Sequence, residues 1–481
     1  MTSPRVTLAL AAALSLGGAT AVLAQDFDRA KVPAPGATPK MPTPDVHRHT
    51  LPNGLELWTV ERHDLPLVNA VLVVRAGAAN DGADAGLSAV TAGLLSQGSA
   101  DRSAPEFARA VEQLGIQLNA GAGVERTTVT LQTLTSTADS AFRLLGELVA
   151  RPAFDSAEVE RDRQLRLTAL RARRDQPTVV ATRVFNAQVY GEDAPYGHPA
   201  DGTLASLAAI GRPAITGFYG EYYRPGNALL VVVGDVTPER AAALAMASLG
   251  GWQGKAAVKE PVPALPVPRP ATVYLVDKPK AAQSEIRIGG PGAARTSPDF
   301  YALSVLNTIL GGQFSSRINL NIRENKGYTY GARSSFTFLR GPGPFMASGG
   351  VVTAKTDSSV VEFMRELVDI RGSRPVTPTE VAFATGSIVR AYPRRLETSA
   401  GVASELADLA YFRLPPSELV DYQKKIGAVT PTDVDRVAKQ YLQPEHFVTV
   451  VVGDLATIQP GIEALKLGAV RVVDSEGNPV P

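Results

Sequence analysis

Histidine and cysteine are the side chains that most often bind transition metals or serve as nucleophiles and bases, and this chain has few of them. Among its 481 residues there are five histidines and no cysteine. Without cysteine the chain cannot build a disulfide framework, an iron–sulfur cluster, a thiolate zinc site or a cysteine nucleophile. It also lacks a Gly-x-Ser-x-Gly element, so nothing in it supports an independent serine hydrolase.

The five histidines are not spaced for a helical metal site. Such a site uses two histidines four positions apart, because residues i and i+4 share one face of a helix. Here His47 and His49 are two positions apart before the first strand, His63 lies in a turn, His198 lies in a Tyr-Gly-His-Pro loop, and His446 lies at a strand edge. We therefore expect solvated or structural roles for all five.

The charge balance excludes further classes of function. The chain has 48 basic and 47 acidic side chains, a net charge of +1, and so has no general attraction to nucleic acid or to an anionic membrane. A basic run extends from Arg161 to Arg174, but Leu165, Leu167 and Leu170 interleave with its arginines. This spacing favours an amphipathic helix with a solvated basic face, and we predict no nucleic-acid partner.

The start of the chain has the features of an export signal. Arg5 is followed by an apolar stretch from Val6 to Leu16 and by small residues that end at Ala24. We predict a secretory signal peptide over residues 1–24, cleaved after about Ala24, with an uncleaved anchor as the alternative. The apolar stretch is short for a membrane span, and no later segment is long and apolar enough. The expected mature protein is exported and periplasmic.

Proline-rich segments divide the remainder. Residues 25–45 are rich in Pro, Ala and Asp, and we expect a disordered lead-in. Residues 260–270 contain five prolines, which excludes a helix or a central strand and predicts a stiff linker over residues 257–271. The linker separates an expected N-terminal domain, residues 46–256, from a C-terminal domain, residues 272–481.

The two expected domains repeat one another. At a constant offset of 219 positions, Tyr222 matches Tyr441, and the run Val-Val-Val-Gly-Asp at 231–235 recurs at 450–454. Both copies have the pattern of a helix, a Pro-containing turn and a buried strand. An internal repeat of this size predicts a duplicated fold with a pseudo-twofold relation between its halves.

Periodicity within the first domain indicates an α+β fold. Strands with apolar–polar alternation are interleaved with amphipathic helices, and we predict two homologous halves, each a mainly antiparallel sheet with helices packed on one face. The expected strands cover residues 55–60, 67–75 and 127–134, and the expected helices cover residues 86–96, 104–114, 137–149 and 157–173.

Short motifs follow one another in a characteristic order along the chain. They are Leu-Pro-Asn-Gly-Leu at 51–55, Gly86-Leu87, Asn119-Ala120, Tyr222-Tyr223-Arg224-Pro225, Gly234-Asp235, and the segment from Arg323 to Tyr330. In this the chain resembles the M16 peptidase family, the insulinase and mitochondrial processing peptidase group, over about residues 45–460. The resemblance implies a clamshell of two LuxS-like metallohydrolase halves. Active members hold zinc through an inverted His-x-x-Glu-His motif on the helix that follows the Gly-Leu pair.

The chain departs from the family's zinc motif at every ligand position. Ala89 and Gly93 stand where the two histidines belong, and Ala92 stands where the glutamate that takes a proton from the metal-bound water belongs. A third ligand would fall near Ala169 or Leu170, where no glutamate lies nearby. The resemblance therefore implies no cofactor in this chain and Zn²⁺ in a partner subunit.

The second domain keeps more of the family pattern. The resemblance implies that Arg323 and Tyr330, seven positions apart, reach toward the substrate. An arginine can hold a peptide backbone through charge-assisted hydrogen bonds, and a tyrosine hydroxyl can donate to a developing oxyanion. Asn119 and Ala120 resemble the start of the family's edge strand, which binds an extended peptide by adding it to the sheet.

These features together favour a non-catalytic subunit of a heterodimeric M16 zinc metallopeptidase. We expect a zinc-binding M16 subunit as its partner and an unfolded peptide as the substrate of the pair. The motivating pattern is that the metal-binding motif is lost while the Arg/Tyr motif is kept. The alternative is a catalytically inactive M16-fold scaffold or a peptide-binding protein of the cell envelope, in which Arg323 and Tyr330 are remnants.

Overall fold

The structure is a computed structural model that describes Gly36, residues 44–254, Pro263 and residues 265–480. The expected signal peptide, most of the expected lead-in and much of the proline-rich linker lie outside these residues. The described residues from 44 onward form one compact unit. We call residues 44–254 the first half and residues 265–480 the second half. Among the described residues, no helix has the length and apolar character needed to cross a membrane.

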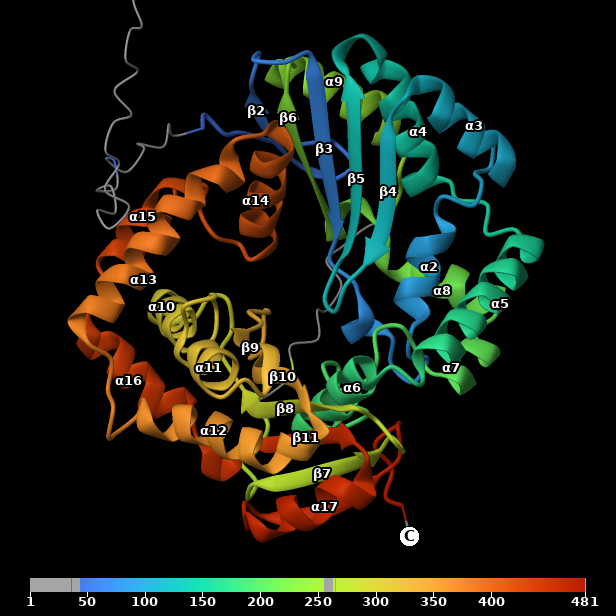
Figure 1. Cartoon of the computed structure of the whole chain (residues 1–481). Helices are drawn as coiled ribbons and strands as arrows, with labels where there is room; N and C mark the ends of the chain where they lie inside the picture. Colours follow the sequence, from blue (N-terminus) through green and yellow to red (C-terminus); the bar gives the residue numbers. More distant parts are fainter. Residues whose placement is uncertain (1–35, 37–43, 255–262, 264, 481) are drawn as a thin grey trace, which may run out of the picture. The chain divides into compact units, whose positions relative to one another are not determined.

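Each half contains one six-stranded mixed sheet (Figure 1). The order is β1-β2-β6-β3-β5-β4 in the first sheet and β12-β7-β11-β8-β10-β9 in the second. The first sheet consists of β1 (His47–Thr50), β2 (Glu56–Glu61), β3 (Leu67–Val74), β4 (Gln117–Ala122), β5 (Thr127–Leu134) and β6 (Ala228–Gly234). The second consists of β7 (Thr272–Asp277), β8 (Gln283–Pro291), β9 (Thr329–Phe336), β10 (Pro344–Val352), β11 (Val448–Gly453) and β12 (Ala469–Val473).

Five strands of each sheet repeat the same topology, and only the outermost strands β1 and β12 differ, one antiparallel and one parallel to its neighbour. This repeat confirms the predicted duplication and α+β class. The repeated Val-Val-Val-Gly segments form β6 and β11, each the third strand of its sheet. Each pairs in parallel with one neighbour, β2 or β7, and antiparallel with the other, β3 or β8. The remaining pairs toward β4 and β9 are antiparallel, so both sheets are mainly antiparallel.

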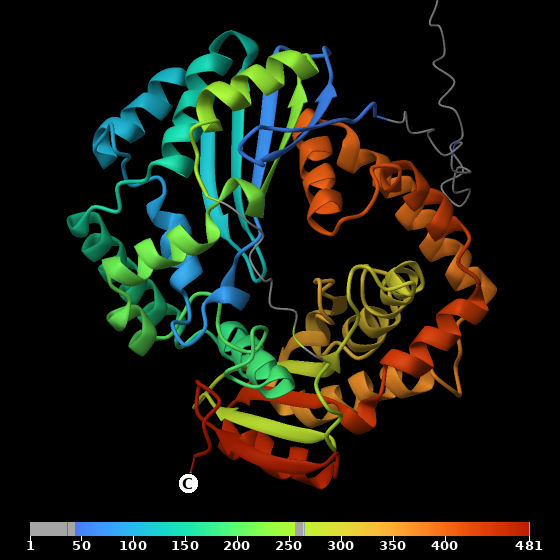
Figure 2. The same ribbon diagram turned by 180° about the vertical axis from the view of Figure 1, so that it is seen from behind.

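One face of the first sheet carries helices of its own half, among them α4 and α9. Leu72, Leu230 and Val232 point from the central strands into a core that includes Phe142 and Leu145 of α4, and Figure 2 shows α9 lying across the sheet. The helices of this half are α2 (Leu87–Leu94), α3 (Ala104–Leu114), α4 (Ala138–Ala150), α5 (Ser156–Arg173), α6 (Pro177–Tyr190), α7 (Leu204–Ala209), α8 (Arg212–Tyr222) and α9 (Pro238–Leu249).

The second sheet has a core of its own, built from β8, β10 and the helices around them. Two of these helices, α13 and α16, begin with a threonine cap, Thr377 or Thr430, followed by proline at the first helical position, and the cap satisfies orphan backbone donors. The helices are α10 (Phe300–Leu310), α11 (Arg317–Asn319), α12 (Thr356–Asp369), α13 (Pro378–Ala391), α14 (Ser399–Tyr411), α15 (Glu418–Gly427), α16 (Pro431–Tyr441) and α17 (Leu455–Ala464).

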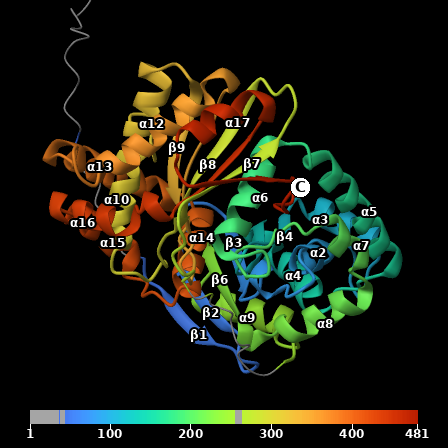
Figure 3. The ribbon, with the colours of Figure 1, turned by 90° about the horizontal axis from the view of Figure 1, so that it is seen from below.

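The opposite face of each sheet is covered by a helix from the other half. Helix α14 packs on β3 and β6, and α6 packs on β8 and β11 (Figures 1 and 3). Val231 and Val233 of β6 face α14, whereas Val232 faces the first core. The central strands are therefore buried on both faces, which explains their uninterrupted β-branched sequence. Because α6 and α14 each pack on the sheet of the other half, two buried apolar clusters hold the halves together.

A buried carboxylate adds a second connection between the halves. Glu125, in the turn between β4 and β5, accepts the backbone N–H of Arg340 at 3.0 Å and the hydroxyl of Tyr411 at 3.4 Å. The hydroxyl of Tyr196 also donates to Glu125 and accepts the N–H of Gly341 at 2.9 Å. Buried carboxylates persist where such donors surround them, so this turn is firmly held by the second half.

Candidate functional site

Helix α2 carries the three positions that replace the zinc motif. Ala89 and Gly93 are half-buried on one face, and Ala92 is fully buried. The helix starts at Gly86, whose φ of +92° suits glycine. Asp81 holds this start, because its carboxylate accepts the N–H groups of Gly86 and Ser88 at 2.8 Å each. Burial raises the pKa of Asp81 to about 6.

The exposed face of α2 is occupied by an arginine from α5. Arg166 Nη2 donates to the carbonyl oxygen of Ala89 at 3.0 Å, and its Nε donates to Asp162 Oδ2 at 2.6 Å. A Cβ at Gly93 would lie 2.3 Å from Arg166 Nη2. The basic face of α5, expected to be solvated, is thus partly turned inward at Arg166.

The residues around α2 do not fit a zinc ion. Ala89, Ala92 and Gly93 supply no donor atom, and a guanidinium lies against this helix face. Leu170, near the expected third ligand position, packs against the first core. Within the described residues, no group of three or more His, Asp or Glu side chains is arranged to hold a metal ion.

None of the five histidines lies on α2, and one of them, His198, contacts the loop that precedes this helix. His63 is held between two carboxylates, whose hydrogen bonds raise its pKa. His198 reaches the loop before α2 with its ring Nε2 at 2.6 Å from a carbonyl oxygen. The partners are Asp45 for His47, Asp235 and Glu61 for His63, Ala78 O for His198, and Arg269 O for His446. His49 is exposed in β1.

Arg323 is presented by a short π-helix, Leu320–Asn325, that follows α11. Within it, Lys326 N–H donates to Asn321 O at 3.0 Å, a bond that spans five residues. Single-turn π-helices are rare and concentrate at functional sites. The guanidinium carbon of Arg323 lies 4.6 Å from the centre of the Phe314 ring, and Nε lies 3.3 Å from Glu324 Oε1. The arginine is thereby oriented but still accessible.

Tyr330 lies near the start of edge strand β9 and is 89% exposed. Its hydroxyl makes no hydrogen bond to any described residue, so it can meet a ligand. Strand β9 packs against the π-helix, and Arg323 and Tyr330 therefore come from adjoining elements. Phe314, 62% exposed, joins them as a residue that sequence reasoning did not assign a role. The available signal was an aromatic residue in the segment that leads into Arg323.

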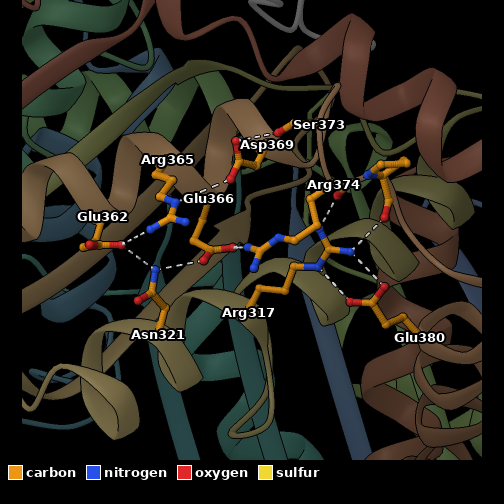
Figure 4. A network of polar contacts seen from close by, with 10 residues as sticks. Arg317, Asn321, Glu362, Arg365, Glu366, Asp369, Ser373, Arg374 and Glu380 are labelled. Atoms are coloured by element: carbon orange, nitrogen blue, oxygen red, sulfur yellow. Dashed lines mark hydrogen bonds and ion pairs between the residues drawn. The ribbon is translucent and has the colours of Figure 1, made fainter.

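A polar network fixes the segment that carries Arg323 (Figure 4). Asn321 Nδ2 donates to Glu362 Oε2 and to Glu366 Oε1, both at 2.9 Å. Arg317 donates to Glu380 through Nε at 2.7 Å and Nη2 at 2.8 Å. Despite partial burial, these bonds lower the pKa of Glu380 to about 2. The π-helix is therefore anchored to α12 through Asn321, and α11, which precedes it, is anchored to α13 through Arg317.

Asn119 and Ala120 lie in β4, the outer strand of the first sheet. They pair with Thr130 and Val129 of β5 on one side only, and no described strand pairs with the other side. Helix α2 packs beside β4. Among the described residues, one edge of β4 therefore has no strand partner. Strand β9 holds the corresponding outer place in the second sheet.

The fold is a duplicated α+β architecture, and family models identify the class of protein. The insulinase (peptidase family M16) model matches residues 59–196, and the model of the peptidase M16 inactive domain matches residues 209–385. Together they span more than half of the chain. The chain belongs to the M16 peptidase family.

Individual relatives agree with this assignment. An uncharacterized zinc protease of Mycobacterium leprae is 28% identical over 84% of this chain and 91% of its own length. The crystal structure of a peptidase M16 inactive domain from Pseudomonas fluorescens aligns with a TM-score of 0.80 at 25% identity, over 85% of this chain and 98% of that one. A protease from Helicobacter pylori shares the fold, with a TM-score of 0.79 at 23% identity over 85% of this chain and 100% of that one.

Proposed function

We propose that this chain is the non-catalytic subunit of a two-chain M16 zinc peptidase. The observation that carries the proposal is an asymmetry between the halves. In the first half, alanine, glycine and Arg166 take the place of the metal motif, whereas in the second half Arg323 and Tyr330 remain accessible on an anchored segment. The export signal expected over residues 1–24 leads us to place the pair in the periplasm.

In this role the chain contributes binding and charge stabilisation. The guanidinium of Arg323 donates charge-assisted hydrogen bonds to the backbone of an unfolded peptide. The hydroxyl of Tyr330 donates to the oxyanion that forms as water attacks the scissile carbonyl. The partner's Zn²⁺, when bound, activates that water. The free edge of β4 at Asn119 and Ala120 offers a second place to hold the peptide in extended form.

The test uses this chain with a partner, encoded in the same operon, that has an intact His-x-x-Glu-His motif. We expect peptide cleavage by the pair and none by either chain alone. Tyr330→Phe should lower kcat of the pair by about 100- to 1,000-fold, as loss of an oxyanion donor does, with zinc content unchanged. Tyr328→Phe is the matched control, because this half-buried tyrosine packs against the second core. Zinc binding and peptide cleavage by the isolated chain would contradict the proposal.

A scaffold or peptide-binding protein is the second candidate, and the free edge of β4 favours it. The two functions differ in what they require of Arg323. If the pair carrying Arg323→Ala cleaves peptides as fast as the wild-type pair, the Arg/Tyr motif is a remnant and the scaffold is supported. A loss of kcat/KM in that variant, with the complex still assembled on size-exclusion chromatography, supports the catalytic pair.

A further inference from the structure

The side chain that lies against α2, Arg166, itself carries a positive charge. We propose that Arg166 is a built-in replacement for the metal ion, which ties α5 to α2 across the vacated motif positions and excludes a metal from this half. This role of Arg166 requires only this chain, because neither a partner nor Arg323 and Tyr330 take part in it.

The first support is the pairing geometry of the two helices. Ala89 and Gly93 are four positions apart and share one face of α2, as the two histidines of a helical metal site would. Asp162 and Arg166 are likewise four positions apart on α5 and form an ion pair. Arg166 Nη2 then reaches across to Ala89 O at 3.0 Å. A guanidinium thus makes the link between helices that a shared ion would make.

The second support is the steric requirement at Gly93. The missing Cβ would lie 2.3 Å from Arg166 Nη2, closer than non-bonded atoms approach. Any side chain at this position, including a histidine, therefore competes with the arginine for the same space. The glycine inside α2, unfavourable for a helix on its own, is explained by the guanidinium that lies over it.

The third support is the local charge. Arg166 and Asp162 are both largely shielded, with side chains 26% and 18% exposed, and shielded charges are stable when they are paired. A divalent cation placed beside the guanidinium would be repelled, and Asp162, the carboxylate within 4.0 Å of the Gly93 Cβ position, is already engaged. Removing Arg166 frees this carboxylate.

A double-mutant cycle tests the steric part. Gly93→Ala should lower Tm in the wild-type chain, because the methyl group displaces Arg166. In an Arg166→Ala background the same change should raise Tm, because alanine favours a helix once the guanidinium is gone. Gly217→Ala, in α8 with no atom near its Cβ position, should raise Tm in both backgrounds. An equal shift from Gly93→Ala in both backgrounds would overturn the proposal.

Metal binding tests the exclusion. We would introduce Ala89→His and Gly93→His together, with Arg166 retained and with Arg166→Ala, and confirm folding of each by circular dichroism. With Arg166 absent, the two imidazoles and the freed Asp162 provide three donors. We expect about one zinc per chain after dialysis in that variant and none when Arg166 is retained. Adding Asp162→Asn should abolish the binding. Equal zinc contents with and without Arg166 would refute the exclusion.

Discussion

Asp81 is a buried carboxyl group whose ionisation state bears on the start of α2. Its pKa is raised by burial from 3.8 to about 6, although it accepts two backbone N–H groups. Between these two values the native state holds a proton that the unfolded chain has lost. By linkage, this group makes stability fall as the pH rises from about 4 to about 6.

The corresponding prediction concerns the pH dependence of unfolding. The unfolding free energy of the wild-type protein should fall between pH 4 and pH 7 because Asp81 ionises. Asp81→Asn, which cannot ionise, should reduce this fall by up to about 2 kcal/mol. Urea denaturation at several pH values measures the slope. Asp84→Asn, at an exposed position in the same loop, is the control and should leave the slope at its wild-type value. A wild-type slope in Asp81→Asn would show that Asp81 ionises normally.

Phe314 provides a second test at a single residue. Its ring lies under the guanidinium of Arg323 at 4.6 Å, and such an exposed cation–π contact contributes about 0.5–1 kcal/mol. Phe314→Leu should reduce kcat/KM of the proposed pair by about two- to fivefold, with little change in Tm. Phe383→Leu alters another exposed phenylalanine, on α13, and should change neither quantity.

Among the elements, the π-helix depends on α12 for its position. Glu366, a buried residue of α12, accepts from Asn321 at 2.9 Å and also pairs with Arg374. Glu366→Gln removes the charge and one acceptor oxygen, and we expect a loss of about 1–3 kcal/mol in unfolding free energy by chemical denaturation. Glu397→Gln, at an exposed position, should change it by less than about 0.5 kcal/mol. Equal effects of the two substitutions would mean that the network contributes little.

For the whole molecule, the exchanged helices make each half depend on the other. Leu406 of α14 belongs to the second half but lies fully buried in a cluster with Trp58 of the first sheet. Leu406→Ala should cost about 2–5 kcal/mol, through lost burial and the cavity that remains. Because both tryptophans, Trp58 and Trp252, lie in the first half, their fluorescence should report this loss. Val368→Ala, at an exposed site on α12, should not shift that transition.

Local elements of this protein were readable from the sequence because their signals are local. The expected helix over residues 104–114 and the expected strand over residues 127–134 have the observed bounds. Apolar periodicity, Ser103 as a helix cap and Gly115 in the left-handed conformation define that helix within about a dozen residues. The π-helix at Arg323 was not readable, because a shift of one hydrogen-bond partner leaves no distinct pattern in sequence.

The sequence by itself determined the duplication, the α+β class, the family resemblance and the loss of metal donors at Ala89, Ala92 and Gly93, because these depend on residue identity and spacing. Only the tertiary structure decided which sheet each amphipathic helix covers and which side chain fills the vacated positions. The pattern of α6 and α14 specifies an apolar face but no partner for it. Arg166 belongs to a basic run that reads as solvated, and only the packing of α5 on α2 brings its guanidinium to Ala89.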